Sequence, residues 1–322
     1  MARCKIYSCL PSAQQEPDQV QILDLSHQQL QKAPSELGKF VHLEELDLSS
    51  NELCDLPREI TQLQNLRVLW LTGNCFTQVP QEIFELRSLE RLYLSYNNIE
   101  SLPELPKDLP LRALLISHNK LCEIHHSWQK AQNLTTIIAN CNKLPIIPEA
   151  ICLLSNLADL DFSENHISEV PTEIDWPNLQ KLYIWNNHIE KLSTQISKCT
   201  QLQEFDISGN YLEQIPQEIG SLHNLQMLDM RKNKLQQIPQ EIGQCKKLQR
   251  LLLSYNKLQQ LPESIGALCA LHELSLYKNE LHSLPKTLKD LGELKDISLK
   301  ENLLSADKIQ QLQQQLPKVS FH

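Results

Sequence analysis

Apolar residues recur along the chain at fixed distances from an asparagine, and the arrangement repeats every 22 or 23 residues. The residues five and three before each asparagine are apolar, which predicts a short β-strand. The residues two and five after it are apolar again, so the pattern predicts a turn at the asparagine that leads back to the core. A period of this length indicates a one-dimensional stack of similar units. The asparagines are Asn51, Asn74, Asn97, Asn119, Asn142, Asn165, Asn187, Asn210, Asn233, Asn256, Asn279 and Asn302.

The repeated asparagine has a structural explanation. At the bend, its amide can satisfy N–H and C=O groups that no neighbouring strand reaches, and stacked copies predict a ladder inside the coil. We therefore assign it no catalytic role. A thirteenth unit precedes the ladder, with Leu23, Leu25 and Leu30 in register and Gln28 at the asparagine position. The predicted repeats span residues 19–304.

Proline stands six residues after the asparagine position in ten units. Proline fixes φ and removes a backbone donor, so the return segment cannot form a regular strand. We expect polyproline-like or short helical segments there. The prolines are Pro34, Pro57, Pro80, Pro103, Pro148, Pro171, Pro216, Pro239, Pro262 and Pro285.

Both ends of such a stack expose core edges that must be covered. We expect residues 1–18 to form an N-terminal cap. At the other end, Ile309, Leu312 and Leu316 have helical spacing, and Pro317 stops the run. Residues 305–322 are therefore predicted to be a C-terminal helical cap with a short final strand.

The full phrase is LxxLxLxxNxLxxLPxxIxxL, as in residues 43–63, and residues 214–248 repeat it closely as QIPQEIGSLHNLQMLDMRKNKLQQIPQEIGQCKKL. It resembles the 23-residue leucine-rich repeat of cytoplasmic Ras-suppressor-type proteins and of many bacterial proteins. The resemblance covers about nine tenths of the chain. It implies an α/β fold, a right-handed β/α horseshoe solenoid of about 13 repeats with a parallel β-sheet on its concave face.

Charge and cysteine usage narrow the classes of function. The net charge is −9 without a large Lys/Arg cluster, so no nucleic-acid partner is expected. The ten cysteines form no CxxC pair; Cys199 and Cys245 fall at core positions, and the others are expected to be free thiols in a reducing compartment. The chain shows neither a convincing signal peptide nor about 20 consecutive apolar residues. We expect a cytoplasmic monomer without a membrane partner.

The strand residues that face away from the core are the informative ones. Four consecutive repeats in the first half of the chain each carry a large apolar residue at the position four before the asparagine. Together these residues are predicted to form a row roughly 15 Å long. Such a row rimmed by charge is typical of a protein-binding site, and aromatic anchors dominate such sites. The alternative is that the row stabilises strand pairing by cross-strand packing. The row is Trp70, Tyr93, Leu115 and Ile138, with Arg91 and Asp161 at its rim.

Two further aromatic clusters follow on the same predicted face. One is Tyr183 with Trp185, and the other is Tyr255 and Tyr277 beside Leu252. We expect each either to bind a partner or to support strand pairing.

The fifth repeat breaks the pattern with Ile124-His125-His126-Ser127-Trp128. Adjacent histidines invite a metal site, but no carboxylate or cysteine accompanies them at ligand spacing. Trp128 takes the place of a core isoleucine. We therefore expect a structural irregularity, with no metal and no cofactor.

No catalytic constellation stands out. Gly38-Lys39-Phe40 lacks the elements of a phosphate-binding loop. The leading hypothesis is a non-enzymatic protein-interaction module that binds an unidentified protein partner in the cytoplasm. In one version of this hypothesis the protein is a bacterial effector that is translocated into a host cell. The alternatives are an intracellular regulatory scaffold for small GTPases or phosphatases, and an enzyme with an unrecognised site.

Overall fold

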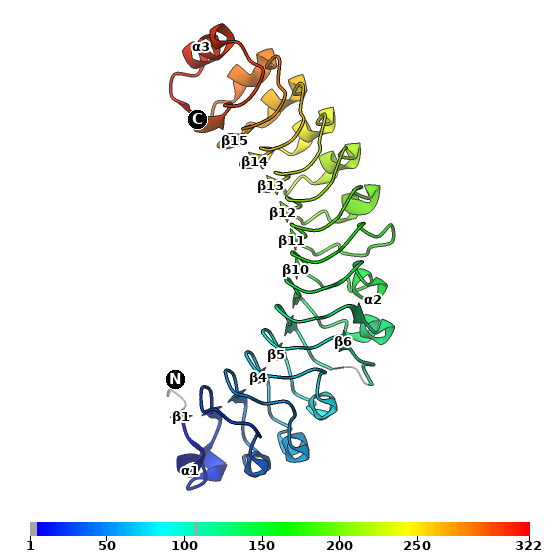
Figure 1. Cartoon of the computed structure of the whole chain (residues 1–322), viewed down its shortest axis with the longest axis vertical. Coiled ribbons are helices and arrows are strands. Elements are labelled where there is room, and N and C mark those ends of the chain that lie inside the picture. Colours follow the sequence, from blue (N-terminus) through cyan, green and yellow to red (C-terminus); the bar gives the residue numbers. More distant parts are fainter. Residues whose placement is uncertain (1–4, 107–108) are drawn as a thin grey trace. The chain divides into compact units, whose positions relative to one another are not determined.

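The structure, a computed structural model, describes residues 5–106 and 109–322 (Figure 1). Its contacts divide the chain into two compact units. The first unit contains the residues up to 144 together with 148–157, and the second contains 145–147 and 158–322. The repeated phrase gives no sign of this division, and each unit is described by itself below.

Each unit has a sheet of short parallel strands that follow one another in chain order. The middle residue of the regular strands is fully buried, and its two neighbours face away from the core. The strands of the first unit are β1 (Ile6–Tyr7), β2 (Ile22–Asp24), β3 (Glu45–Asp47), β4 (Val68–Trp70), β5 (Arg91–Tyr93), β7 (Ala113–Leu115) and β9 (Thr136–Ile138). Those of the second unit are β10 (Asp159–Asp161), β11 (Lys181–Tyr183), β12 (Glu204–Asp206), β13 (Met227–Asp229), β14 (Arg250–Leu252), β15 (Glu273–Ser275), β16 (Asp296–Ser298) and β17 (Ser320–Phe321).

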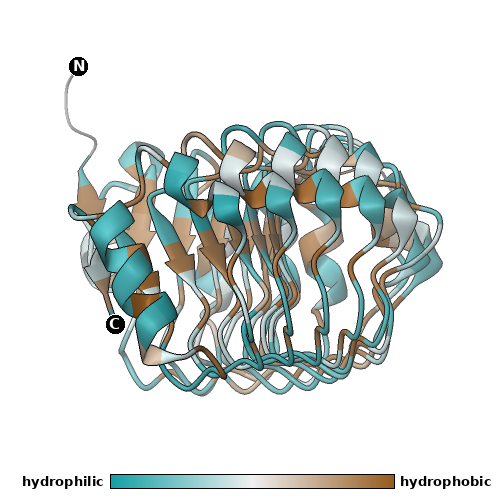
Figure 2. Ribbon diagram, turned by 90° about the horizontal axis from the view of Figure 1, so that it is seen from above, coloured by the Kyte–Doolittle hydropathy of each residue, from teal (hydrophilic) through white to brown (hydrophobic). Residues whose placement is uncertain are grey.

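Most return segments are short helices, as the prolines predict, whereas the segment after Pro171 forms none. Pro216 has φ −67° and ψ 149°, a polyproline conformation, and directly precedes η7 (Gln217–Ser221). Buried leucines and isoleucines on these turns complete the core. In Figure 2 the strands carry much of the brown, hydrophobic colour, and the return segments add to it. The other return elements are η2 (Ser35–Lys39), η3 (Arg58–Gln62), η4 (Gln81–Glu85), η5 (His126–Lys130), α2 (Glu149–Cys152), η6 (Thr194–Lys198), η8 (Gln240–Gln244), η9 (Glu263–Ala267) and η10 (Lys286–Asp290).

The irregular fifth repeat is structural, as expected. His125 replaces the proline, and its ring accepts a hydrogen bond from the Ser127 N–H at the start of η5. Trp128 is 1% exposed, and its indole N–H donates to the Pro103 carbonyl over 2.9 Å. Beside it, β6 (Ser101–Leu102) and β8 (Glu123–Ile124) form a separate two-stranded sheet.

The asparagine ladder is confirmed. Asn210 is 3% exposed, and its side-chain oxygen accepts the Ile189 N–H over 2.9 Å. Its amide group donates to the Ile184 carbonyl of the preceding repeat and to the Ile207 carbonyl of its own. One side chain thus hydrogen-bonds the backbones of two successive repeats. Asn74, Asn97, Asn119 and Asn233 repeat this arrangement.

The residue before every ladder asparagine has a positive φ. The values run from 51° at Asn186 to 69° at Gly73, although ten of the twelve positions carry residues other than glycine. A left-handed conformation costs such a residue roughly 1–2 kcal/mol. The ladder hydrogen bonds therefore hold a turn that most of these residues would not adopt alone.

The ends of the chain add strands to the two sheets. At the N-terminal end, β1 pairs with β2, and it is followed by α1 (Leu10–Ala13) and η1 (Pro17–Gln19). At the other end, α3 (Ala306–Gln315) buries Leu312, and β17 pairs with β16. Residues 1–4 of the expected N-terminal cap lie outside the described residues.

Replacing Asn210 by alanine should destabilise the second unit strongly. The Ile189 N–H and the Ile184 and Ile207 carbonyls would lose their partner in a buried site, at about 1–3 kcal/mol for each group left unsatisfied. Gln28→Ala is the matched control, because Gln28 occupies the same repeat position but is exposed. Denaturant unfolding followed by circular dichroism measures both. Equal midpoints for the two variants would contradict a stabilising ladder.

Close packing between successive return helices can be tested at two glycines. A Cβ built on Gly243 would lie 2.6 Å from the Ser264 carbonyl oxygen, whereas one on Gly292 would meet nothing within 4 Å. Gly243→Ala should therefore cost about 1–3 kcal/mol. Gly292→Ala should leave stability unchanged or raise it by up to about 1 kcal/mol. Denaturant unfolding midpoints measure both effects. An unchanged midpoint for Gly243→Ala would contradict close packing between successive return helices.

Candidate functional site

Four large apolar residues form a continuous row on the open sheet face of the first unit. Strand register pairs Trp70 with Tyr93, Tyr93 with Leu115, and Leu115 with Ile138. All four side chains are partly exposed. The geometry of the row is therefore as predicted, and what it binds stays a prediction. We call Trp70, Tyr93, Leu115 and Ile138 the first-unit stripe.

Two rings of the stripe pack against each other. The centroids of Trp70 and Tyr93 are 5.5 Å apart, and the ring planes differ by 18°. Offset stacking of this kind contributes about 0.5–1.5 kcal/mol beyond area burial. Cross-strand packing is thus real here, yet both side chains stay partly exposed. A stacked pair also presents a more rigid surface to a partner than two separate side chains would.

A second stacked pair lies on repeats of the stripe and was not predicted. Tyr96 and His118 have ring centroids 4.2 Å apart at 11°, and Tyr96 is 58% exposed. Both precede a ladder asparagine and have positive φ, so their side chains leave the turn at the rim of the sheet. The signal that could have revealed them is the position directly before the asparagine. The strand alternation alone does not include it.

The two charged residues predicted at the rim fall in different units. Arg91 is exposed on β5 of the first unit and is paired in register with Val68 and Ala113. Asp161 ends β10 of the second unit and is described with that unit.

The second predicted cluster combines aromatic and acidic groups. Tyr183 is partly buried, and its hydroxyl donates to Glu204. Burial and this carboxylate raise the pKa of Tyr183 well above its usual range. Glu204 also accepts from Lys181 over 3.4 Å. Trp185, two residues after Tyr183, is partly exposed on the same face.

Carboxylates surround this cluster on the neighbouring strands. Burial raises the pKa of Asp159, Asp161 and Asp206 above the usual range of aspartate. Asp229 is 2% exposed and binds the Arg231 guanidinium, with a distance of 2.9 Å from Nε to Oδ2. In this region Glu204 and Asp229 are each paired with a cation. Asp161 and Asp206 are not in any ion pair found among the described residues.

The third cluster differs from the prediction in one residue. Tyr255 and Tyr277 meet edge to face at 5.3 Å, with the Lys278 ammonium 5.3 Å from the Tyr255 ring centre. A hydrogen bond from its hydroxyl to Glu301 raises the pKa of Tyr277 to about 12. Leu252 does not belong to the exposed cluster, because it is only 3% exposed in the sheet between Asp229 and Ser275.

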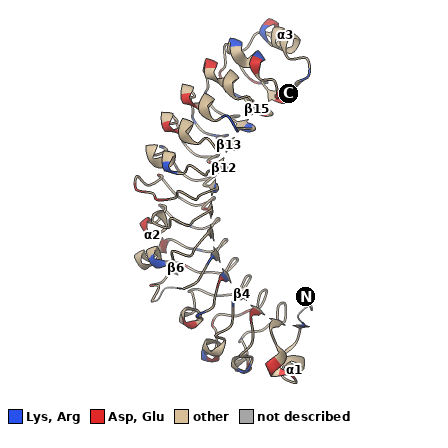
Figure 3. Cartoon of the chain, turned by 180° about the vertical axis from the view of Figure 1, so that it is seen from behind, with Lys and Arg blue, Asp and Glu red and all other residues tan. Residues whose placement is uncertain are grey.

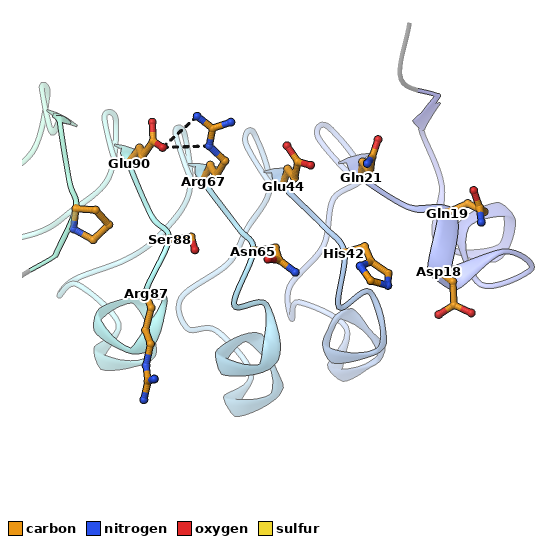
Figure 4. Close-up of a pocket in the computed structure, with 11 residues that line it drawn as sticks. Asp18, Gln19, Gln21, His42, Glu44, Asn65, Arg67, Arg87, Ser88 and Glu90 are labelled. Atoms are coloured by element: carbon orange, nitrogen blue, oxygen red, sulfur yellow. Dashed lines mark hydrogen bonds and ion pairs between the residues drawn. The ribbon is translucent and has the colours of Figure 1, made fainter. Parts of the chain in front are cut away.

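A polar hollow lies elsewhere on the first unit. Figure 4 shows its side chains projecting from successive repeats, where Arg67 binds Glu90 over 3.0 Å. This ion pair neutralises two of the charged residues that line the hollow. The hollow measures about 810 Å³ and is lined by Asp18, Gln19, Gln21, His42, Glu44, Asn65, Arg67, Arg87, Ser88, Glu90 and Pro110.

Charge and cysteines add no reactive centre in the described parts of the chain. Both acidic and basic residues stand on the return helices (Figure 3), and η7, η8 and η9 carry acidic residues only. Within residues 5–106 and 109–322, no three His, Cys, Asp or Glu side chains gather as metal ligands, and no helix has the length and apolar character to cross a membrane.

Cys199 and Cys245 are core residues as predicted, and Cys152 is buried as well. Burial raises the pKa of Cys199 to about 12, which keeps this thiol protonated.

Comparisons with known proteins agree with this architecture. The rat volume-regulated anion channel subunit LRRC8A is 35% identical over 105 residues, which make up 32% of this chain and 13% of that protein. A leucine-rich-repeat protein of Leptospira interrogans superposes with a TM-score of 0.64 and 28% identity, over 99% of each chain. The ectodomain of the Arabidopsis receptor kinase HAESA, in complex with a peptide hormone, gives a TM-score of 0.73 and 27% identity, over 92% of this chain and 52% of that one.

The family profile described as leucine-rich repeat region matches residues 12–109 and 192–319. These residues make up more than half of the chain, and the ladder, the strands from β2 to β16 and the proline-led return helices lie within or between the matched segments. The chain belongs to the leucine-rich repeat family.

Proposed function

We propose that the chain is a non-enzymatic protein-interaction module that binds a protein partner on the first-unit stripe. The observation that carries the proposal is the unbroken register of four partly exposed apolar side chains, two of them stacked aromatic rings. Solvent-facing strand positions elsewhere in the same unit carry Asp24 and Asp47 instead. Folding alone therefore does not require an apolar residue at this position.

The stripe has the composition of an interface centre. Tryptophan and tyrosine contribute most of the binding energy at many interfaces, where they fill pockets of the partner and exclude water. The Tyr96 and His118 pair adds polar edges on repeats that carry the stripe. The partner surface that fits is apolar at its centre and carries hydrogen-bonding groups at its border.

The solved relatives support binding as the general role. The HAESA ectodomain was determined with a peptide hormone, and the rat relative is a channel subunit of which this chain spans 13%. These partners and activities belong to those proteins. For this chain we propose only that a protein segment is the ligand.

We further propose that the protein acts in the cytosol and that it is a bacterial effector delivered into a host cell. The similarity to the Leptospira interrogans protein over 99% of both chains supports a bacterial source. The nine described cysteines carry free thiols, which suits a reducing compartment. Fractionation of infected cells with an epitope-tagged protein tests delivery, and protein confined to the bacteria would contradict it.

Replacing both stacked rings by aspartate should abolish partner binding without unfolding the chain. Trp70→Asp with Tyr93→Asp removes the apolar centre, and each hot-spot residue contributes about 2–4 kcal/mol to binding. Adjacent aspartates already occupy this position at Asp24 and Asp47, so the strands should tolerate them. Affinity capture from host and bacterial lysates, quantified by mass spectrometry, measures the loss.

The matched control is Ser275→Asp with Ser298→Asp, which adds two aspartates at the same repeat position on adjacent strands of the second unit. It should retain every partner that the unchanged protein captures. Partners that survive the double stripe variant would overturn the proposal. A small decrease in melting temperature is expected from the lost ring stacking. A stripe variant that no longer folds, as judged by circular dichroism, would overturn the proposal, because the row would then be required for strand packing.

A further inference from the structure

The sheet face formed by β10, β11 and β12 in the second unit places an aromatic strand between two acidic ones. Register pairs Tyr183 with Asp161 on one side and with Asp206 on the other. Strand spacing puts these two carboxylate-bearing positions about 10 Å apart, with the aromatic ring between them. We call this surface the β10–β12 face. It belongs wholly to the second unit and shares no residue with the first-unit stripe.

The cations near this face are already engaged. Lys181 lies 3.4 Å from Glu204, and Arg231 binds Asp229. Five carboxylates thus share two cations. Asp159, Asp161 and Asp206 are in none of the ion pairs found among the described residues, although Lys181 attracts Asp159 and Arg231 attracts Asp206 at longer range.

Hydrogen bonds leave acceptor capacity on these three groups. Oδ1 of Asp161 accepts the Ser163 N–H, and Oδ1 of Asp206 accepts the Ser208 N–H, each over 2.9 Å. A carboxylate can accept about four hydrogen bonds, so each retains free lone pairs. Asp159 Oδ1 is buried from solvent and has no hydrogen-bond partner at all.

The unpartnered Asp159 atom is the feature that points to a missing group. The fully buried Ser163 hydroxyl lies beside the Asp161 carboxylate and favours its charged form, so it is not a ligand contact. Strand alternation directs the side chains of Asp159 and Asp161 toward the same face. A buried carboxylate oxygen without a donor is disfavoured, so a donor supplied by a partner would be stabilising there.

The aromatic strand decides which cation fits. A lysine ammonium is strongly hydrated, whereas a guanidinium is planar, weakly hydrated and stacks on aromatic faces. A guanidinium lying over Tyr183 or Trp185 would direct N–H donors from its two edges toward Asp161 and Asp206. This arrangement combines a cation–π contact with two charge-assisted hydrogen bonds.

We propose that the β10–β12 face binds an arginine side chain in an extended basic segment of a partner protein. The guanidinium of this arginine stacks on the ring of Tyr183 or Trp185 and bridges the carboxylates of Asp161 and Asp206. Neighbouring basic residues of the segment meet Asp159. Uncompensated negative charge on both sides of an aromatic strand selects such a segment over an acidic or purely apolar one.

The experiment uses three fluorescein-labelled peptides that alternate alanine with three arginines, three lysines or three citrullines. Citrulline has the shape of arginine without the charge. Fluorescence anisotropy with the full chain in low salt measures each affinity. The arginine peptide should bind at least about tenfold more tightly than the lysine peptide, because an ammonium group neither stacks on the rings nor presents a planar fork to two carboxylates. It should bind much more tightly than the citrulline peptide, which carries no positive charge.

The decisive variant is Asp161→Asn with Asp206→Asn, which should weaken binding of the arginine peptide at least tenfold. Its matched control is Asp24→Asn with Asp47→Asn. Asp24 and Asp47 occupy the same repeat position and accept the same type of serine N–H, and their replacement changes the net charge equally. The control should bind within about twofold of the unchanged protein, since separated exposed charges are screened at distances beyond a Debye length.

Two single variants separate stacking from charge. Trp185→Leu should weaken binding of the arginine peptide, whereas Tyr183→Phe keeps the ring and should not. If the double variant fails to fold, Asp159→Asn replaces it, with a smaller loss expected. Equal weakening by the decisive and control variants would show unspecific charge attraction and overturn the proposal. Equal affinity for the lysine peptide, or no measurable binding of the arginine peptide, would overturn it as well.

Discussion

The hydrogen bonds of the buried asparagines are the constraint on which each repeat depends. A ladder side chain such as Asn187 donates to backbone carbonyls of its own repeat and of the preceding one, and accepts a backbone N–H from the latter. Strands of three residues leave many turn groups unpaired, and the ladder satisfies them inside the core. It also holds the residue before it at positive φ, a conformation such as that of Tyr255 at 59°. Spacing, turn and strand register therefore follow from a single side chain.

This constraint separates the chain into residues that build the repeat and residues that are free to differ. The middle strand residue, the two apolar residues after the asparagine and the return helix are committed to the core. The outward strand residues and the residue before the asparagine contribute little to it. That is why one unit can display stacked Trp70 and Tyr93 while the other displays Asp161, Tyr183 and Asp206 at the same repeat position. Fold and recognition occupy different positions of the same phrase.

Much of this separation could be predicted from the sequence. The period defines the register, so the row from Trp70 to Ile138, the polyproline conformation before the return helices and the buried Trp128 all follow from spacing. The Tyr96 and His118 stack does not, because it depends on a left-handed turn that a two-residue alternation does not reveal. Ion pairs such as Lys181 with Glu204 depend on side-chain rotamers across neighbouring repeats. The unpartnered Oδ1 atom of Asp159 depends on how neighbouring side chains cover it, which residue type alone does not determine.

The aspartates of the sheet face show why the structure was needed to separate support from recognition. Asp24, Asp47, Asp161, Asp206 and Asp229 each accept the N–H of the residue two positions later, so aspartate at this place is first of all a turn residue. What distinguishes them is the set of side chains around each carboxylate. Asp229 faces Arg231 and is neutralised, whereas Asp161 and Asp206 flank an aromatic ring and retain free acceptor capacity in a partly desolvated site. Desolvation disfavours an unpaired carboxylate, and a cation supplied by a partner would relieve that cost. The same residue type thus serves the turn everywhere and offers a binding group only where its neighbours leave its charge uncompensated.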